Sequence, residues 1–145
     1  MKYDKTISRE IALQAIYQLL ITNDKKTVLT LSWIEEVFKE ELEYRNKEFI
    51  TKYAKKIIKK YIKNYKKINT LFKSNFTKNP LIMPEIDKAI IFLGIVLLKF
   101  MKDTTPKIAI NETIILAKAY GSSNNFYKAV NKFLDTVLKN QNTLE

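Results

Sequence analysis

The stretch PKIAINETIILAKAYG, residues 106–121, decides the fold because it carries the signals of one well-specified helix. Thr105 precedes it as an N-cap residue whose hydroxyl can accept a backbone N–H bond. Pro106 suits the first helical position, where its missing N–H group costs nothing. Gly121 follows the last helical residue, and we expect it to end the helix in a left-handed turn.

Working outward, apolar residues recur every three or four positions through most of the chain, as in helices with one buried face. The chain has only two glycines and three prolines, so we expect short connections. We predict an all-α fold of about seven helices, one domain over residues 1–145, in two packed subdomains with a seam near 79–84. The other helices are expected near residues 7–21, 29–41, 49–65, 68–76, 84–101 and 124–139.

The predicted 84–101 helix carries the longest apolar run, AIIFLGIVLL at residues 89–98. This run is far shorter than the ~20 residues of a membrane span, so we interpret it as a central buried helix and predict no membrane segment. We expect Trp33, Ile34, Val37 and Phe38 to point inward from the 29–41 helix. One core is expected to contain Ile90, Leu93, Leu97, Ile115, Val130 and Leu134.

The residue inventory argues against catalysis. Cysteine and histidine are both absent, which excludes disulfides and thiolate metal sites and removes the commonest general base. The two glycines stand apart, so no phosphate-cradling loop is present. Glu85 and Asp87 open a predicted helix, where acidic groups stabilise the helix dipole. We predict no enzymatic activity, cofactor or metal, and a cytoplasmic location, since residues 1–10 lack the apolar core of a signal peptide.

The formal net charge of +11 comes mostly from one segment. Residues 47–80 carry eleven lysines and one glutamate, whereas residues 1–46 have a net charge of −1 and residues 81–145 of +2. The chain has 24 lysines and only two arginines, so its cations are mobile point charges and rarely bidentate donors. Such a surface is typical of nucleic-acid binding. Abundant Lys, Asn and Ile is also typical of an AT-rich genome, and both explanations stay open.

Six lysines of the predicted 49–65 helix, between Lys52 and Lys63, fall opposite its apolar residues. Tyr53, Tyr61 and Tyr65 fall on the apolar side, so packing explains them better than stacking on bases. A solvated face is the simplest interpretation of the lysines. Contact with RNA along this stripe is the alternative.

Three motifs occur in a fixed order near the two ends of the chain. SREIALQAIYQ at residues 8–18 matches the pattern RE-x-A-x-Q-A-L-Y, INE at 110–112 is followed by LAK at 116–118, and AVNKFLD at 129–135 contains VN-x-x-LD. Together they resemble the NusB family of bacterial antitermination factors. The resemblance spans nearly the whole chain because the motifs have the family's order and spacing.

The resemblance implies a helical protein that binds the boxA element of nascent ribosomal RNA together with NusE, which is also a small-subunit ribosomal protein. The pair would help to assemble a transcription elongation complex that resists termination. The RNA-binding candidates, taken from the matched motifs and their neighbours, are Lys2, Lys5, Arg9, Tyr17, Lys128, Asn131 and Lys132.

This chain departs from the family pattern at several of these positions. The family's arginine-rich opening is thin here, with only Lys5 and Arg9 kept and Lys2 nearby. Ala129 and Lys132 replace an aromatic residue and a glycine, and Phe126 or Tyr127 could supply the missing ring. Phe92 stands where an arginine is expected. Asn111 and Glu112 match, and we interpret them as structural, whereas Tyr17 suits either base stacking or packing beside Leu13 and Leu20.

Three functions are therefore compared. The favoured one is RNA-binding antitermination with NusE. The second is a protein-interaction module that has lost RNA affinity with its arginines. The third is the helical domain that accompanies an RNA methyltransferase, which the lack of a cofactor-binding segment disfavours. The sequence does not decide between a monomer and a dimer.

Overall fold

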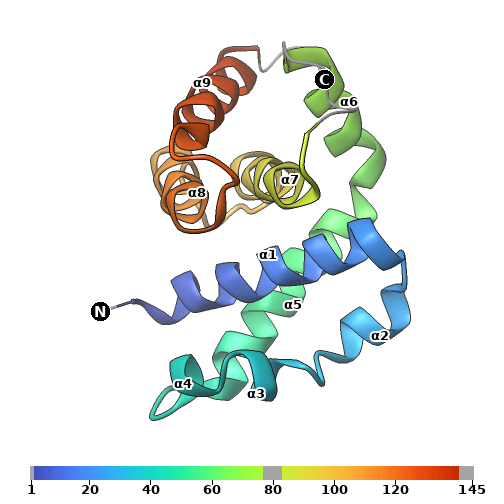
Figure 1. Cartoon of the computed structure of the whole chain (residues 1–145), viewed down its shortest axis with the longest axis vertical. Coiled ribbons are helices and arrows are strands. Elements are labelled where there is room, and N and C mark those ends of the chain that lie inside the picture. Colours follow the sequence, from blue (N-terminus) through green and yellow to red (C-terminus); the bar gives the residue numbers. More distant parts are fainter. Residues whose placement is uncertain (1, 77–82, 141–145) are drawn as a thin grey trace.

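The computed structural model describes residues 2–76 and 83–140, and within them every regular element is a helix (Figure 1). The all-α prediction is confirmed. The described part has nine helices where about seven were expected, because short helices replace the single one predicted at 29–41. Their bounds are α1 (Asp4–Thr22), α2 (Lys25–Thr30), α3 (Ile34–Val37), α4 (Lys39–Leu42), α5 (Lys47–Lys63), α6 (Tyr65–Asn75), α7 (Glu85–Lys99), α8 (Pro106–Tyr120) and α9 (Phe126–Lys139).

Three non-glycine residues with left-handed backbone lie at helix ends in the segment from Asn23 to Tyr44. Asn23 ends α1 with φ 56°, Leu31 ends α2 with φ 54°, and Tyr44 follows α4 with φ 62°. Asp24 then begins α2 by accepting a hydrogen bond from the Thr27 N–H group at 3.1 Å. The buried Leu31 side chain belongs to the core, so packing holds a backbone conformation that its sequence does not favour.

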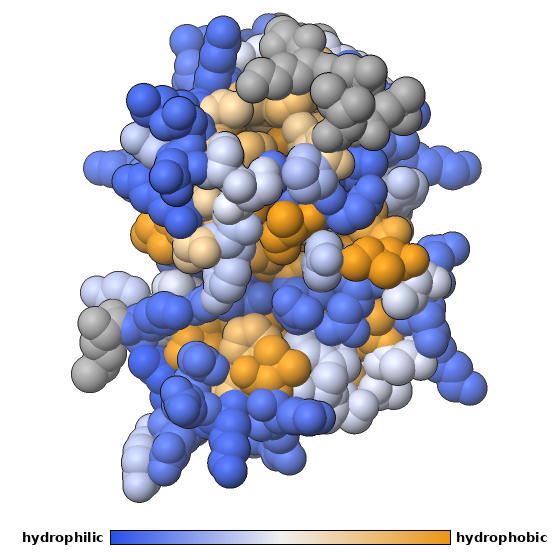
Figure 2. Space-filling model, viewed as in Figure 1, coloured by the Kyte–Doolittle hydropathy of each residue, from blue (hydrophilic) through white to orange (hydrophobic). Residues whose placement is uncertain are grey.

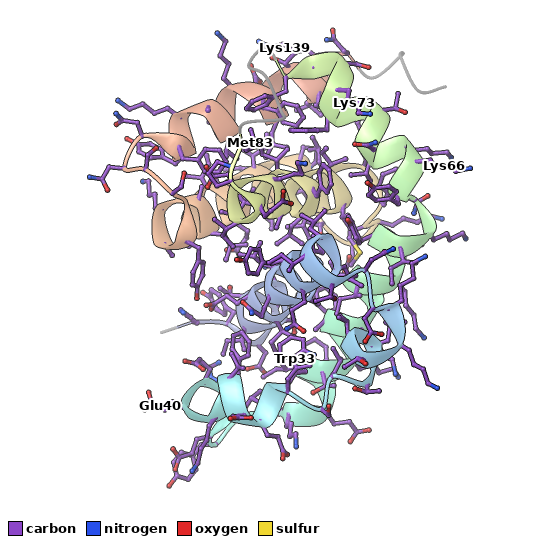
Figure 3. All side chains as sticks on the ribbon, turned by 45° about the vertical axis from the view of Figure 1, so that its right-hand side comes forward. Trp33, Glu40, Lys66, Lys73, Met83 and Lys139 are labelled. Carbon is purple, nitrogen blue, oxygen red and sulfur yellow. The ribbon has the colours of Figure 1, made fainter. Side chains whose placement is uncertain are left out.

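The prediction that Val37 points inward is wrong. Ile34 and Phe38 are buried, and the half-buried Trp33 packs against the core, as expected (Figure 3). Val37 is 53% exposed. Val37 is the last residue of α3, and Ile34 and Phe38 on either side of it make the buried contacts of this turn.

Helix α1 lies between two groups of helices (Figure 1). It packs against α5 on one side and against α7 on the other, and α5, α6, α8 and α9 also pack against α7. The buried Ser8 hydroxyl donates to the backbone carbonyl of Ile50 at 2.8 Å, which a larger side chain at this contact would prevent. Hydrophilic residues cover much of the outer surface, and apolar patches show between the helices (Figure 2).

Helix α7 is the central helix, as predicted, with Ile90, Leu93 and Leu97 fully buried. Gly94 sits where three helices meet. A Cβ atom there would lie 2.9 Å from Cγ2 of Thr113 in α8 and 3.1 Å from Cδ1 of Leu134 in α9. The absence of a side chain therefore permits the close approach of α8 and α9 to α7.

Five of the six predicted core residues are buried, and Ile115 is the exception, with 52% of its surface exposed. The buried face of α8 consists of Ala109, Thr113, Leu116 and Ala117. Ile115 lies two residues after Thr113, which is more than half a turn around the helix. Its apolar character suggested burial, but its position on α8 places it outside.

The bounds of α8 match the prediction, and Thr105 Oγ1 accepts the Ile108 N–H bond at 3.3 Å. The prediction of a left-handed turn at Gly121 is wrong, because the backbone of Gly121 is extended, with φ −61° and ψ 151°. Glycine is needed there for space. A Cβ atom would lie 2.5 Å from the Ala117 carbonyl oxygen and 2.9 Å from Cδ2 of Phe126.

Asp87 has a larger role than the helix-dipole contribution expected from its position. Its buried carboxylate accepts two hydrogen bonds from Ser122, at 2.8 Å from the backbone N–H and 2.5 Å from the hydroxyl. These bonds fasten the α8–α9 connection to the start of α7.

The seam predicted at 79–84 falls mainly on residues 77–82, outside the described residues. Within residues 2–76 and 83–140, no helix is long and apolar enough to cross a membrane.

Replacing Leu93 by alanine should lower the free energy of unfolding by ~2–5 kcal/mol, because a fully buried side chain leaves a cavity. Urea denaturation monitored by circular dichroism measures the loss. Ile115→Ala on the exposed side of α8 is the matched control and should cost less than ~1 kcal/mol. Equal losses for the two variants would show that α7 is not the centre of the core.

Candidate nucleic-acid interface

Arg9, a candidate RNA ligand, is held inside the protein. It is 5% exposed, and its Nη1 atom lies 2.6 Å from Oε1 of Glu112 in α8. The Thr6 hydroxyl donates to the same carboxylate oxygen at 3.0 Å. The structural role predicted for Glu112 is confirmed, since this one side chain fastens α1 to α8. Asn111 beside it is exposed.

Lys2 and Lys5 lie at the exposed start of α1 and also have acidic partners. Lys2 Nζ is 2.8 Å from Oε1 of Glu10, and the Lys2 side chain remains 53% exposed. Tyr120 donates to the other Glu10 oxygen at 2.7 Å. Burial and this hydrogen bond to a carboxylate raise the pKa of Tyr120 to about 12, so it stays protonated at neutral pH.

Lys5 belongs to a cluster around Asp103, in the connection between α7 and α8. Lys5 Nζ lies 3.3 Å from Oδ2 of Asp103, and the Tyr53 hydroxyl donates to the same oxygen at 2.9 Å. Burial acts to raise the pKa of Asp103, but the hydrogen bonds from Tyr53 and Lys5 and the charges of Lys5 and Lys56 lower it on balance. Asp103 is therefore ionised at neutral pH and neutralises part of the positive charge at this corner.

A hollow of about 400 Å³ lies between the start of α1 and α8. Lys2, Tyr3 and Asn111 line it together with the exposed Ile108 and Ile115. The Ile115 side chain, misassigned to the core, is therefore part of this surface. Its wall combines apolar area with polar groups, which suits an unpaired base or a protein side chain.

Tyr17 lies further along α1 and is half-buried against the core. This position agrees with the packing interpretation of its ring. A role for Tyr17 in RNA contact stays a prediction.

Lys128, Asn131 and Lys132 are all exposed on α9. Their spacing of three and four residues places them on one face, opposite the buried Val130 and Leu134. Neither lysine has an ion-pair partner among the described residues. Both line a hollow of about 330 Å³ that reaches Asn75 and Phe76 at the end of α6.

The two aromatic residues proposed to replace the family's missing ring have different environments. Phe126 is buried in the core and packs closely against Gly121. Tyr127 is half-buried, and Lys118 Nζ lies 4.7 Å from its ring centroid. Tyr127 is therefore the better placed of the two. Phe92, in place of the expected arginine, is also buried, 5.3 Å from Phe72 between ring centroids.

Helix α8 lies between the candidate residues of α1 and those of α9. Its Glu112 and Tyr120 contact α1, whereas its Lys118 contacts α9. The sequence did not predict the Tyr120–Glu10 or Asp103–Tyr53 contacts, because the partners are 110 and 50 residues apart. The described residues include no group of three or more acidic side chains placed to hold a metal ion.

Replacing Glu112 by alanine should lower the free energy of unfolding by ~3 kcal/mol, because it leaves the buried Arg9 guanidinium without its carboxylate. Asp135→Ala is the matched control, since it breaks the exposed Asp135–Lys139 pair and should cost less than ~1 kcal/mol. Urea denaturation of both variants measures the difference. A loss at Glu112 as small as that at Asp135 would contradict a structural role for the buried pair.

Comparison with known proteins relates this helical chain to one family. A family model described as the NusB family matches residues 6–139. The transcription antitermination protein NusB of Buchnera aphidicola subsp. Cinara cedri is 34% identical over 146 residues, which cover 100% of this chain and 97% of that protein. The protein of the same name from Clostridium novyi is 32% identical over 135 residues, covering 91% and 96% of the two chains.

The relative from Tolumonas auensis, also a transcription antitermination protein NusB, is 32% identical over 132 residues, with 91% and 90% covered. Proteins of this family are antitermination factors and are not enzymes. The matches extend through α1, α8 and α9, the helices that carry the three sequence motifs. The chain therefore belongs to the NusB family of transcription antitermination proteins.

Proposed function

We propose that this protein binds the boxA element of nascent ribosomal RNA together with NusE and supports processive transcription of ribosomal RNA. The family match over residues 6–139 carries the proposal. The protein acts within the transcription elongation complex and therefore in the cytoplasm. Two exposed surfaces support RNA contact, one on α9 and one at the start of α1.

The cations of the α9 surface are less engaged by carboxylates than those of the α1 surface. Lys128 and Lys132 lie one turn apart without acidic partners among the described residues, and Asn131 between them can donate to and accept from a base edge. Lysine contacts to phosphates give affinity, and contacts to base edges give specificity. We assign Lys128 and Lys132 to phosphates and Asn131 to a base.

The α1 surface contributes less charge than the sequence suggested. Lys2 and Lys5 are partly exposed, but each must leave a carboxylate before it can hold a phosphate. Arg9 supports the site by holding α1 against α8. Because these ion pairs lower the affinity of the α1 surface for phosphates, tight binding requires NusE to supply additional phosphate and base contacts.

The same ion pairs favour a second candidate function. If Lys2, Lys5 and Arg9 stay engaged with Glu10, Asp103 and Glu112, the protein acts as a helical module that binds NusE and has little RNA affinity of its own. RNA binding with and without NusE distinguishes the two functions.

The isolated protein should bind labelled boxA RNA weakly, and the mixture with NusE should bind at least about tenfold more tightly than either protein, a gain of ~1.4 kcal/mol. Fluorescence anisotropy with boxA RNA and a scrambled strand of equal composition measures both affinity and specificity. A mixture no tighter than its stronger component would refute cooperative recognition. Binding of NusE with no effect on RNA affinity would favour the interaction module.

The double substitution Lys128→Gln and Lys132→Gln should weaken binding of boxA RNA by the mixture. It should also reduce the salt slope by ~1.4, because each phosphate contact to a single strand contributes ~0.7. Lys25→Gln with Lys26→Gln on α2 removes the same charge from exposed positions away from α9 and is the control. Equal slopes for the two variants would place the RNA elsewhere than on α9.

A further inference from the structure

The lysine stripe of α5 forms a groove. Six lysines line it, namely Lys52, Lys55, Lys56, Lys59, Lys60 and Lys63, and Phe49 and Tyr53 complete it at one end. The groove encloses about 640 Å³ and follows most of the length of the helix. Lys52 and Lys63 are 11 residues apart, which corresponds to ~16 Å along an α-helix.

The groove lysines differ from several other lysines of the molecule in making no ion pairs. Lys2, Lys5, Lys47 and Lys139 each make an ion pair, whereas none of the six groove lysines does so with any described residue. Asp103 interacts with the charge of Lys56 at one end of the groove, and no carboxylate of the described residues forms a direct ion pair with any of the six lysines. An AT-rich genome explains a high lysine count, and the continuous row of six lysines without ion pairs along one helix face is the feature on which the inference rests.

One end of the groove offers an aromatic face. Phe49 is 39% exposed, and its ring stacks on Tyr53 with centroids 5.9 Å apart and planes 16° apart. The Tyr53 ring itself is buried, as the packing interpretation of this residue predicted. An exposed ring beside a row of cations is an arrangement that binds unpaired bases without sequence preference.

The groove also continues the α1 surface. Lys5 Nζ lies 5.0 Å from the centroid of the Tyr53 ring, and Lys56 Nζ lies 5.9 Å from the same centroid. One tyrosine thus joins the start of α1 to the α5 stripe. Beyond Lys63 the exposed Lys66 projects outward from α6 (Figure 3).

We propose that the α5 groove is a further RNA-binding surface, beside those on α9 and α1, which holds the phosphate backbone of single-stranded RNA without reading its sequence. Lysines on flexible stems can follow a phosphate chain of irregular geometry, whereas fixed recognition of carboxylates favours arginine. Phe49 stacks on one unpaired base at the Lys5 end. The strand that leaves the α1 surface continues along α5, so the groove adds affinity for any RNA that flanks the specific element.

The test uses the whole protein and labelled oligouridine, which lacks boxA, at low salt. Lys55→Gln, Lys59→Gln and Lys63→Gln together should weaken oligouridine binding at least about tenfold and lower the salt slope by ~2, or ~0.7 for each lost contact. Lys25→Gln, Lys26→Gln and Lys107→Gln remove the same charge from exposed lysines outside the groove and should leave the slope within ~0.7 of wild type.

Phe49→Leu keeps an apolar side chain but removes the ring, and it should weaken binding at least about threefold, because stacking on a base is lost. Far-ultraviolet circular dichroism must show unchanged helicity in each variant. Equal losses in the two triple variants would overturn the proposal, since only net charge would then matter. It would also be overturned if wild-type protein fails to bind oligouridine, or if it binds oligoglutamate through these lysines in preference to RNA.

This surface and the proposed recognition of boxA can fail separately. Loss of oligouridine binding in the groove variant, with the NusE-dependent preference for boxA over its scrambled strand retained, supports both. Lysine-dependent oligouridine binding without any preference for boxA in the presence of NusE would overturn the proposed function and leave the groove assigned.

Discussion

Helix α7 is apolar around nearly its whole circumference, and this constraint organises the other helices. A helix of this kind must be covered on every side to remove its apolar surface from water. Here α1, α5, α6, α8 and α9 pack around it. Gly94 sets how closely α8 and α9 can approach. The amphipathic helices therefore turn one face to α7 or its neighbours, and their other faces carry the surfaces proposed for binding.

In this packing the arginines and the lysines take different positions. Arg9 is drawn into the α1–α8 contact, where its planar guanidinium meets Glu112 and its buried charge is compensated. Arg45 likewise pairs with Asp4, at 3.0 Å. Both arginines of the chain thus serve the fold, and lysines form the exposed positive surface. Exposed lysines can hold phosphates electrostatically but offer few rigid donors for base recognition, which is why the proposed function assigns part of the recognition to NusE.

Helix α8 connects the candidate surfaces. Its N-terminal half contacts α1 through Glu112, and its C-terminal half contacts Glu10 through Tyr120 and Tyr127 through Lys118. A shift of α8 would therefore move the α1 and α9 surfaces together. Asp87, bonded to Ser122 beyond the end of α8, restrains the connection to α9 from the other side.

Local signals in the sequence determined the helical class, the bounds of α8 and the burial of Leu93 and Leu97, because capping and periodicity act within a few residues. The motif order likewise indicated the family. Only the tertiary structure decided that Ile115 is exposed, that Gly121 provides space and that Arg9 is internal. The position of Arg9 depends on Glu112, 103 residues away, and the exposure of Ile115 depends on which face of α8 the other helices cover. Gly121 is needed because the chain folds back after α8 and brings Phe126 against it. Helical spacing alone holds no information about these neighbours.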